Sequence, residues 1–193
     1  MTRRTRLAFV LSRLKGLLLA PGREWKVIND ERLGRVTLFR DFIVLPCALL
    51  SLLVVLLRWT TADFSVALRW GVINLAACTA GCYVTFRVAR VFLAAEIAEV
   101  TPVAFKLSLY TFVTYIPFRS LSMGFSSREF IGELLAVCCL YSIHVLYSGL
   151  GALASMDAAR RRGSCFLVGL LVICLPWIFT RLLTIVFRVP INI

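Results

Sequence analysis

The feature that most constrains this chain is an uncharged run of sixteen mostly apolar residues, FIVLPCALLSLLVVLL at 42–57. A helix that crosses the hydrocarbon core of a membrane needs about 20 predominantly apolar residues. With its polar flanks this run reaches that length, so it predicts a first transmembrane helix. Composition agrees, because 60% of the residues are hydrophobic and only 17% are charged, whereas soluble domains are about half apolar and a quarter charged. We therefore expect an integral membrane protein.

Further apolar stretches follow, separated by polar or helix-breaking segments. EIAEVTP at 96–102 and GFSSREF at 124–130 interrupt the apolar pattern, and DAARRRG at 157–163 ends another stretch with three arginines and a glycine. These breaks predict additional spans at about 66–86, 103–123, 130–156 and 164–187. The expected fold class is all-α, a polytopic transmembrane bundle of five helices.

The charge distribution predicts the orientation of this bundle. The chain carries 22 Lys and Arg against 10 Asp and Glu, and membrane proteins concentrate cations in their cytoplasmic segments. With the N-terminus inside, the cytoplasmic segments hold 15 cations and the outer segments hold 4. We expect a cytoplasmic N-terminus and an external C-terminus. The cations lie between apolar spans and no base-reading motif accompanies them, so we expect contact with the lipid bilayer and its anionic headgroups, and no nucleic acid.

Two domains are expected, a cytoplasmic amphipathic N-terminal segment (1–41) and the transmembrane domain (42–193). Residues 3–19 place leucines and a valine on one helical face with basic residues on its flanks, which is typical of a helix lying in the membrane interface. A secretory signal peptide is the alternative. Arg13 and Lys15 interrupt its apolar core, and no small-x-small cleavage site follows.

A Pro-Gly break at 21–22 ends this N-terminal helix. Trp25 follows, and because tryptophan favours the membrane–water interface we expect it to anchor a second short helix at headgroup depth. The segment would then be an amphipathic foot beneath the bundle, lying on lipid or packing on the other helices. Its candidate contacts with the membrane interface or a partner are Pro21, Arg23, Trp25, Lys26 and Arg32.

Polar side chains inside the spans are costly, so each is either a functional candidate or a packed structural group. Lys106 and Glu133 lie near the ends of predicted spans, where they can instead extend toward the headgroups. Tyr141, His144 and Tyr147 recur every three residues and share one helical face, which would line an internal polar path or form hydrogen-bonded packing. The intramembrane polar candidates are Lys106, Tyr110, Glu133, Tyr141, His144 and Tyr147.

Small residues spaced four apart remove side-chain bulk from one face and let helices approach closely. Such spacing occurs in AACTAGC at 76–82 and SGLGALAS at 148–155, and it serves packing within the chain or self-association. Prolines inside the spans add kinks that any bundle tolerates. The helix-packing candidates are Ala77, Gly81, Pro117, Gly149, Gly151 and Ser155.

Motifs for catalysis and metal binding are missing from the sequence. The 7 cysteines lie in or beside apolar stretches without a C-x-x-C pair, and the single histidine has no carboxylate at ligand spacing. There is no G-x-S-x-G, H-E-x-x-H or P-loop sequence. We expect no metal, no cofactor and no enzymatic activity.

Three stretches taken in order resemble a known family. They are LLLAPGREWKVINDE at 17–31, FKLSLYTFVTYIPFRSLSM at 105–123 and LYSIHVLYSGLGALASMDAARRRG at 140–163. Together with five predicted spans they resemble the Yip family, membrane proteins named for interacting with Ypt/Rab GTPases, and specifically its prokaryotic branch. The residues that carry the resemblance are Pro21, Trp25, Ile28, Tyr110, Pro117, Gly149 and Gly151.

The resemblance implies a membrane-organising or trafficking scaffold in a prokaryotic inner (plasma) membrane, with another membrane protein or a second copy of the chain as partner. The GTPase partner is not carried over, because the Asp-Leu-aromatic-Gly-Pro signature of the eukaryotic members is missing from residues 1–41. The alternative function is a small permease or channel that uses the polar faces of the third and fourth spans. A pore needs polar residues through the full depth of the bilayer, and here they are scattered, so the scaffold is the expected function.

Overall fold

The computed structural model describes residues 3–31, 34–94, 97, 99–125, 129–154 and 156–189. Every regular element in these ranges is helical, which confirms the all-α class. Two predicted site residues, Arg32 and Ser155, lie outside the described residues. The elements are α1 (Arg3–Leu19), α2 (Pro21–Asn29), α3 (Arg35–Phe39), the π-helical turn η1 (Arg40–Val44), α4 (Leu45–Trp59), α5 (Phe64–Leu93), α6 (Val100–Gly124), α7 (Glu129–Cys138), α8 (Tyr141–Leu153) and α9 (Ala158–Val186).

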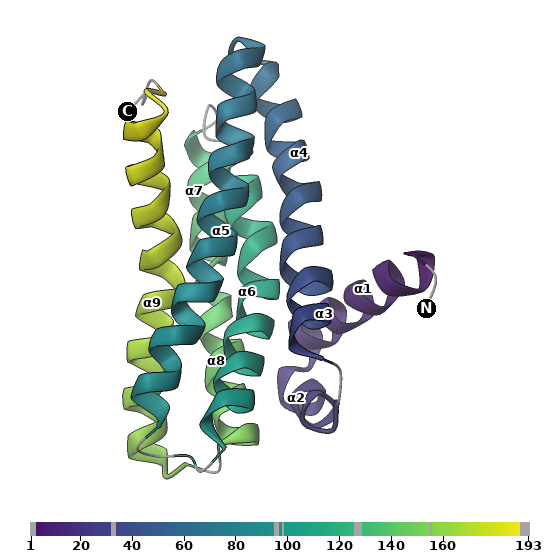
Figure 1. Ribbon diagram of the computed structural model, residues 1–193, viewed down its shortest axis with the longest axis vertical. Coiled ribbons are helices and arrows are strands. Elements are labelled where there is room, and N and C mark those ends of the chain that lie inside the picture. The colour runs from purple at the N-terminus through teal and green to yellow at the C-terminus, as the bar shows by residue number, and fades with distance from the viewer. Residues whose placement is uncertain are drawn as a thin grey trace.

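Helices α4 to α9 form a single elongated bundle in which the chain reverses direction from α4 to α5, from α5 to α6, from α6 to α7 and from α8 to α9, while α7 and α8 run the same way (Figure 1). At one end, which we call the foot end, lie α2, the start of α3, the end of α5, the start of α6 and the start of α9. The opposite end holds the turn between α4 and α5 and the end of α9. From beside α2, helix α1 extends outward past α4 and slants toward the middle of the bundle's length (Figure 1).

The first apolar helix is longer than expected. It runs continuously through α3, η1 and α4, from Arg35 to Trp59, so it begins seven residues before the boundary expected at 42. Pro46 in the first turn of α4 has no N–H to donate. Just before it, the Leu45 N–H bonds to the Arg40 carbonyl five residues back, which is the π-helical pattern. The charged residues that suggested a separate segment therefore occupy the first turns of the helix itself.

Four helices of the described chain are long and apolar enough to cross a membrane. They are Arg35–Trp59, Phe64–Leu93, Phe130–Leu153 and Ala158–Val186, with mean hydropathy between 1.4 and 2.4. These helices confirm the membrane class. The helix expected as the third span, α6, has 25 residues but is not among the four.

Helix α6 is more polar because it lies in the middle of the bundle, packed against α4, α5, α7 and α8. A helix enclosed by other helices does not need an apolar surface on every side. Its buried polar residues are Ser108, Thr111, Thr114, Ser120 and Ser122. Nearby, Asn74 of α5 donates to Ser51 Oγ of α4 at 2.9 Å and to Ser120 Oγ of α6 at 3.0 Å, which links three helices through the core.

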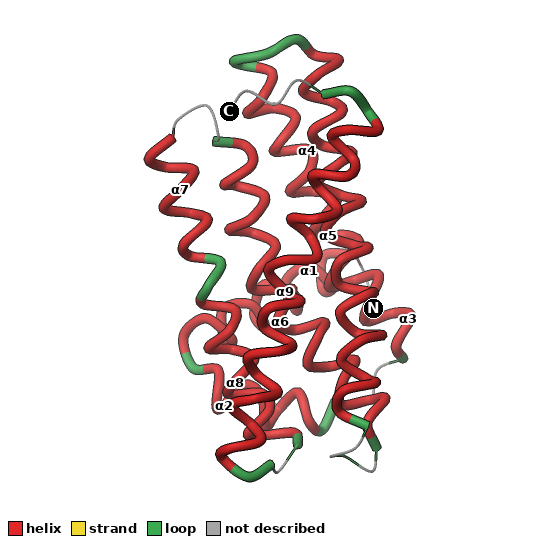
Figure 2. The backbone as a smooth tube through the Cα atoms, turned by 90° about the vertical axis from the view of Figure 1, so that its left-hand side faces the viewer, coloured by secondary structure: helices red, strands yellow, loops and turns green. Residues whose placement is uncertain are grey.

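The expected fourth span is divided into α7 and α8 (Figure 2). At the break, the Leu140 N–H bonds to the Val137 carbonyl and the Ser142 N–H to the Cys139 carbonyl, each three residues back. The chain thus tightens locally without a proline or glycine at the break.

Elsewhere the predicted small residues lie at close helix contacts, where a Cβ on Gly81 of α5 would lie 2.8 Å from Pro176 Cγ of α9. Ala77 is buried one turn away.

Candidate functional site at the foot end

Trp25 is the centre of the contact between the N-terminal helices and the bundle. Its side chain is fully buried, and its Nε1–H donates to the Val145 carbonyl of α8 at 2.9 Å. The indole meets the Tyr110 ring edge-on, with centroids 6.0 Å apart. A Cβ on Gly149 would lie 2.6 Å from indole carbons, so only glycine leaves room for this ring. The structure corrects the expectation of a headgroup anchor, because the bundle, not lipid, covers the ring and satisfies its N–H.

Most of the residues that carried the family resemblance come together at the foot end. Trp25 and Ile28 lie on the buried face of α2, Tyr110 lies on α6 and Gly149 lies on α8. All four are buried, although more than 120 residues separate the first from the last. Pro21 begins α2 at its first helical position, where a missing N–H costs nothing. The two remaining members lie apart from this cluster, since Pro117 lies further along α6 and Gly151 packs against the guanidinium of Arg161.

Lys106 joins α6 to the end of α2. Its Nζ donates to the carbonyl oxygens of Ile28 and Asn29, both at 2.8 Å. Carbonyls in the last turn of a helix have no intrahelical partner and carry partial negative charge, so a lysine there stabilises the helix end. Lys106 thus neither reaches toward headgroups nor stands alone in a span. It caps the C-terminus of α2.

A buried ionic network lies beside Lys106. The Tyr110 hydroxyl donates to the carboxylate of Glu31, whose side chain is 6% exposed. Arg13 of α1 contacts the same carboxylate at 3.9 Å and pairs with Glu24 of α2 at 2.6 Å. The network therefore ties α1, α2 and α6 together. Sequence analysis did not identify Arg13, Glu24 or Glu31 as site residues. The signal that could have indicated an ionic network is the presence of glutamates in an otherwise basic segment.

The tyrosines of α8 contact neighbouring helices, Tyr141 the foot and Tyr147 the helix α9. The Tyr141 hydroxyl donates to the Leu18 carbonyl at the end of α1 at 2.8 Å. Tyr147 accepts a hydrogen bond from Arg161 Nη2 at 2.7 Å, and the guanidinium lies 4.3 Å from the centre of its ring. These two tyrosines hold neighbouring segments and do not line an open path.

His144 and Glu133 lie elsewhere. Both are exposed on the outside of the bundle, and His144 has the Tyr141 ring as a neighbour at 5.6 Å between centroids. The expectation that His144 faces the bundle interior is therefore wrong, whereas Tyr141 and Tyr147 form hydrogen-bonded packing, which was the alternative. Arg23 and Lys26 are exposed on the side of α2 opposite Trp25, where they face away from the bundle.

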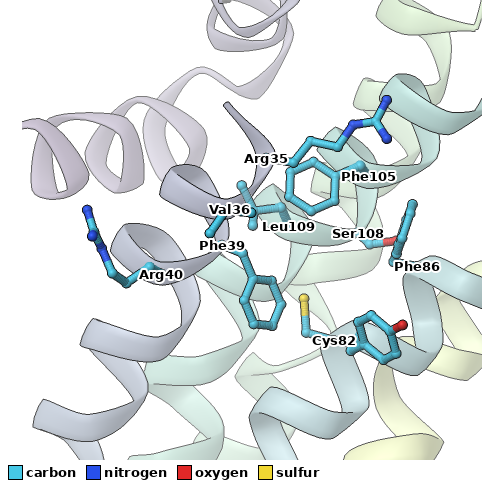
Figure 3. Close-up of a pocket in the computed structure, with 10 residues that line it drawn as sticks. Arg35, Val36, Phe39, Arg40, Cys82, Phe86, Phe105, Ser108 and Leu109 are labelled. Carbon is cyan, nitrogen blue, oxygen red and sulfur yellow. The ribbon is translucent and has the colours of Figure 1, made fainter. Parts of the chain in front are cut away.

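Two cavities with mostly apolar walls flank this site. The larger, of about 530 Å³, lies between α3, η1, α5 and α6 (Figure 3). The smaller, of about 260 Å³, lies between α1, α4 and α6 and is bordered by Pro46 and Pro117. Within the described residues, no group of three or more His, Cys, Asp or Glu side chains is placed to hold a metal ion. The foot-end arrangement is thus suited to docking helices and apolar ligands.

Comparisons with protein-family models, curated proteins and solved structures found no match for this chain. The resemblance to the Yip family rests on the sequence motifs alone and stays a prediction.

Proposed function

We propose that this protein is a non-enzymatic membrane scaffold that presents its N-terminal helix at the cytoplasmic face of a prokaryotic inner membrane. There α1 engages anionic headgroups and either a second membrane protein or another copy of the chain. The observation that carries the proposal is the contrast between α2, which is fixed to the bundle by Trp25 and Lys106, and α1, which projects sideways from it (Figure 1). A rigidly mounted arm is what a scaffold needs to hold a partner at a set position.

The outer face of α1 has the chemistry of an interfacial surface. Leu11 and Leu19 are 57% and 74% exposed, and the exposed Lys15 lies between them on the same face. The opposite face, with Val10 and Leu17, is buried against the rest of the protein. Apolar side chains beside a lysine suit the boundary between acyl chains and phosphates. The foot is thus both packed on the bundle and open to lipid or a partner.

We include α6 as a fifth, central span. At 1.5 Å per residue its 25 residues extend about 37 Å, which exceeds a hydrocarbon core of about 30 Å. Four neighbouring helices shield it, and polar groups at membrane depth are tolerated where protein surrounds them. With this span the N-terminus is cytoplasmic and the C-terminus external. The exposed Arg87, Arg90 and Arg162 then lie at the cytoplasmic foot end, as the positive-inside rule favours.

The test is photo-crosslinking from the full-length protein in its native membrane. A benzophenone amino acid at Leu11 should give a discrete protein adduct, either to a partner or to a second copy. The matched control is Leu170 of α9, which is 50% exposed on the bundle surface and should give lipid adducts only. Lipid adducts from both positions, together with a monomeric protein that carries a solute across vesicles, would instead identify a permease.

A further inference from the structure

The larger cavity at the foot end has walls suited to an acyl chain. Its volume of about 530 Å³ falls within the range of roughly 300–1,000 Å³ found for small-ligand pockets. Phe39 approaches it from α3, Phe86 from α5 and Phe105 from α6 (Figure 3). Val36 and Tyr83 at its edge are 84% and 50% exposed. The edge lies between two helices apolar enough to span a membrane, so the cavity opens toward lipid.

Cations border this apolar cavity. Arg35 is exposed, and its guanidinium extends past Phe105 on the side of Phe86 (Figure 3). Arg87 lies one turn beyond Tyr83 on α5, and its Nη1 donates to the Tyr83 hydroxyl at 3.0 Å. Arg40 lies on the other side of the cavity, with its Nε bonded to Asp41 at 2.9 Å. The lining residues include two arginines and no acidic side chain, which favours an anionic ligand.

A buried hydroxyl in the wall also lacks a partner. Ser108 is 1% exposed, and its Oγ makes no hydrogen bond to any described residue. Its side chain points toward Phe86 at the edge of the cavity (Figure 3). Buried hydroxyls are normally hydrogen-bonded, because leaving one unsatisfied is costly. An ester carbonyl of a bound lipid is an acceptor of the right kind for this position.

We propose that this cavity binds one anionic phospholipid. One acyl chain occupies the aromatic chamber, the phosphate lies at Arg35 and Arg87, and an ester carbonyl accepts the Ser108 hydroxyl. The site goes beyond the proposed scaffold role, since it holds lipid whether or not α1 recruits a partner. Charge at the mouth selects phosphatidylglycerol over phosphatidylcholine, because the zwitterionic phosphocholine headgroup carries no net charge to match the arginines.

Native mass spectrometry of the full-length protein tests this site. The protein is titrated in detergent with palmitoyl-oleoyl phosphatidylglycerol or with phosphatidylcholine of the same chains. We expect one phosphatidylglycerol to be retained in preference, and Arg35→Glu and Arg87→Glu each to weaken its retention at least tenfold. Arg69→Glu is the matched control, because Arg69 is an exposed arginine at the other end of α5. It should retain phosphatidylglycerol as the unchanged protein does.

Two further measurements separate the chain from the headgroup. Val36→Trp places a large ring at the exposed edge of the cavity without disturbing the core, and it should reduce retention of phosphatidylglycerol. Glycerol 3-phosphate alone at the same concentrations should not bind. Equal retention of the two lipids, an equal loss in Arg69→Glu, or binding of glycerol 3-phosphate without chains would overturn the proposal. Each of these results leaves the crosslinking test of α1 unaffected.

Discussion

Trp25 shows how one residue can fix the position of a whole segment. Its indole fills a space that only glycine at position 149 leaves open, and its N–H finds an acceptor on α8. Burial of a large aromatic ring and satisfaction of its one donor favour the same position. Tyr110 adds an edge-on contact from α6. The docking of α2 is therefore determined by shape as well as by apolar area.

Replacing Trp25 with Ala should cost about 3–5 kcal/mol, the usual penalty for removing a buried aromatic ring. Trp25→Phe should cost less, since it keeps most of the apolar contact although it loses the hydrogen bond and part of the ring. Thermal unfolding in detergent and hydrogen exchange in α1 and α2 measure the effect. Trp59→Ala is the control, because Trp59 is 57% exposed at the opposite end. Equal destabilisation by Trp25→Ala and Trp59→Ala would contradict the docked position of Trp25.

Lys106→Met should release the last turn of α2 while keeping most of the unbranched side chain. Two hydrogen bonds to backbone carbonyls are lost, and a cation at a helix C-terminus contributes about 0.3–1 kcal/mol, or up to about 2 when partly buried. We expect faster hydrogen exchange in α2, with α5 and α9 unchanged. Lys26→Met on the exposed side of α2 is the matched control. If it loosens α2 as much as Lys106→Met does, the cap is not the cause.

The sequence identified several residues of this site individually, but it did not indicate that they lie together in the fold. Trp25, Tyr110 and Lys106 stand out by residue type, whereas Arg13 and Glu31 are ordinary charges until the fold pairs them. The error at His144 has a geometric cause. Residues three apart on a helix differ by about 60° around its axis, so three of them cover an arc of about 120°. Tyr141 and Tyr147 lie at the two edges of that arc and contact α1 and α9, while His144 at its centre faces outward.

At the scale of the elements, hydropathy located the helices well but placed some of their ends poorly. A window of apolar residues marks where a helix is needed in a membrane, and the four apolar helices follow that pattern. Hydropathy cannot show that the first helix starts at Arg35, because polar residues are tolerated in a first helical turn that lies at the membrane surface. It also cannot show the break after Cys138, since hydrogen bonds to carbonyls three residues back leave composition unchanged.

Gly81→Val tests the close contact between α5 and α9. A branched side chain would meet the Pro176 ring, and overpacking of this kind costs typically about 1–3 kcal/mol. Thermal unfolding should show a lower midpoint. The matched control is Gly163→Val on α9, where a Cβ meets no atom within 4 Å. A loss of stability in both variants would point to the glycine-to-valine change itself and away from the helix contact.

At the scale of the whole molecule, the two ends of the bundle differ in chemistry. The foot end carries the ionic network of Arg13, Glu24 and Glu31, the lysine cap and the larger cavity. At the opposite end Arg58 donates to the Met123 carbonyl and Arg69 to the Phe187 carbonyl, so these cations cap the C-terminal ends of α6 and α9. The proposed partner, lipid and headgroup contacts all fall on the foot end. The orientation of the bundle in the membrane therefore determines on which side all of these contacts are made.

Cysteine labelling tests the orientation and the fifth span together. In a cysteine-free background, single cysteines at Asp63 and Arg162, both exposed, mark the two ends of the bundle. An impermeant maleimide added outside intact cells should label Asp63→Cys and should reach Arg162→Cys only after lysis, because the foot end is cytoplasmic in the proposed topology.

A second pair, at Ala94 after α5 and Phe125 after α6, flanks the central helix. If α6 crosses the membrane, Phe125→Cys is labelled from outside and Ala94→Cys is not. Labelling of Ala94 and Phe125 from the same side would remove α6 from the spans, and labelling of Arg162 from outside would invert the topology and place α1 on the wrong face for the proposed scaffold.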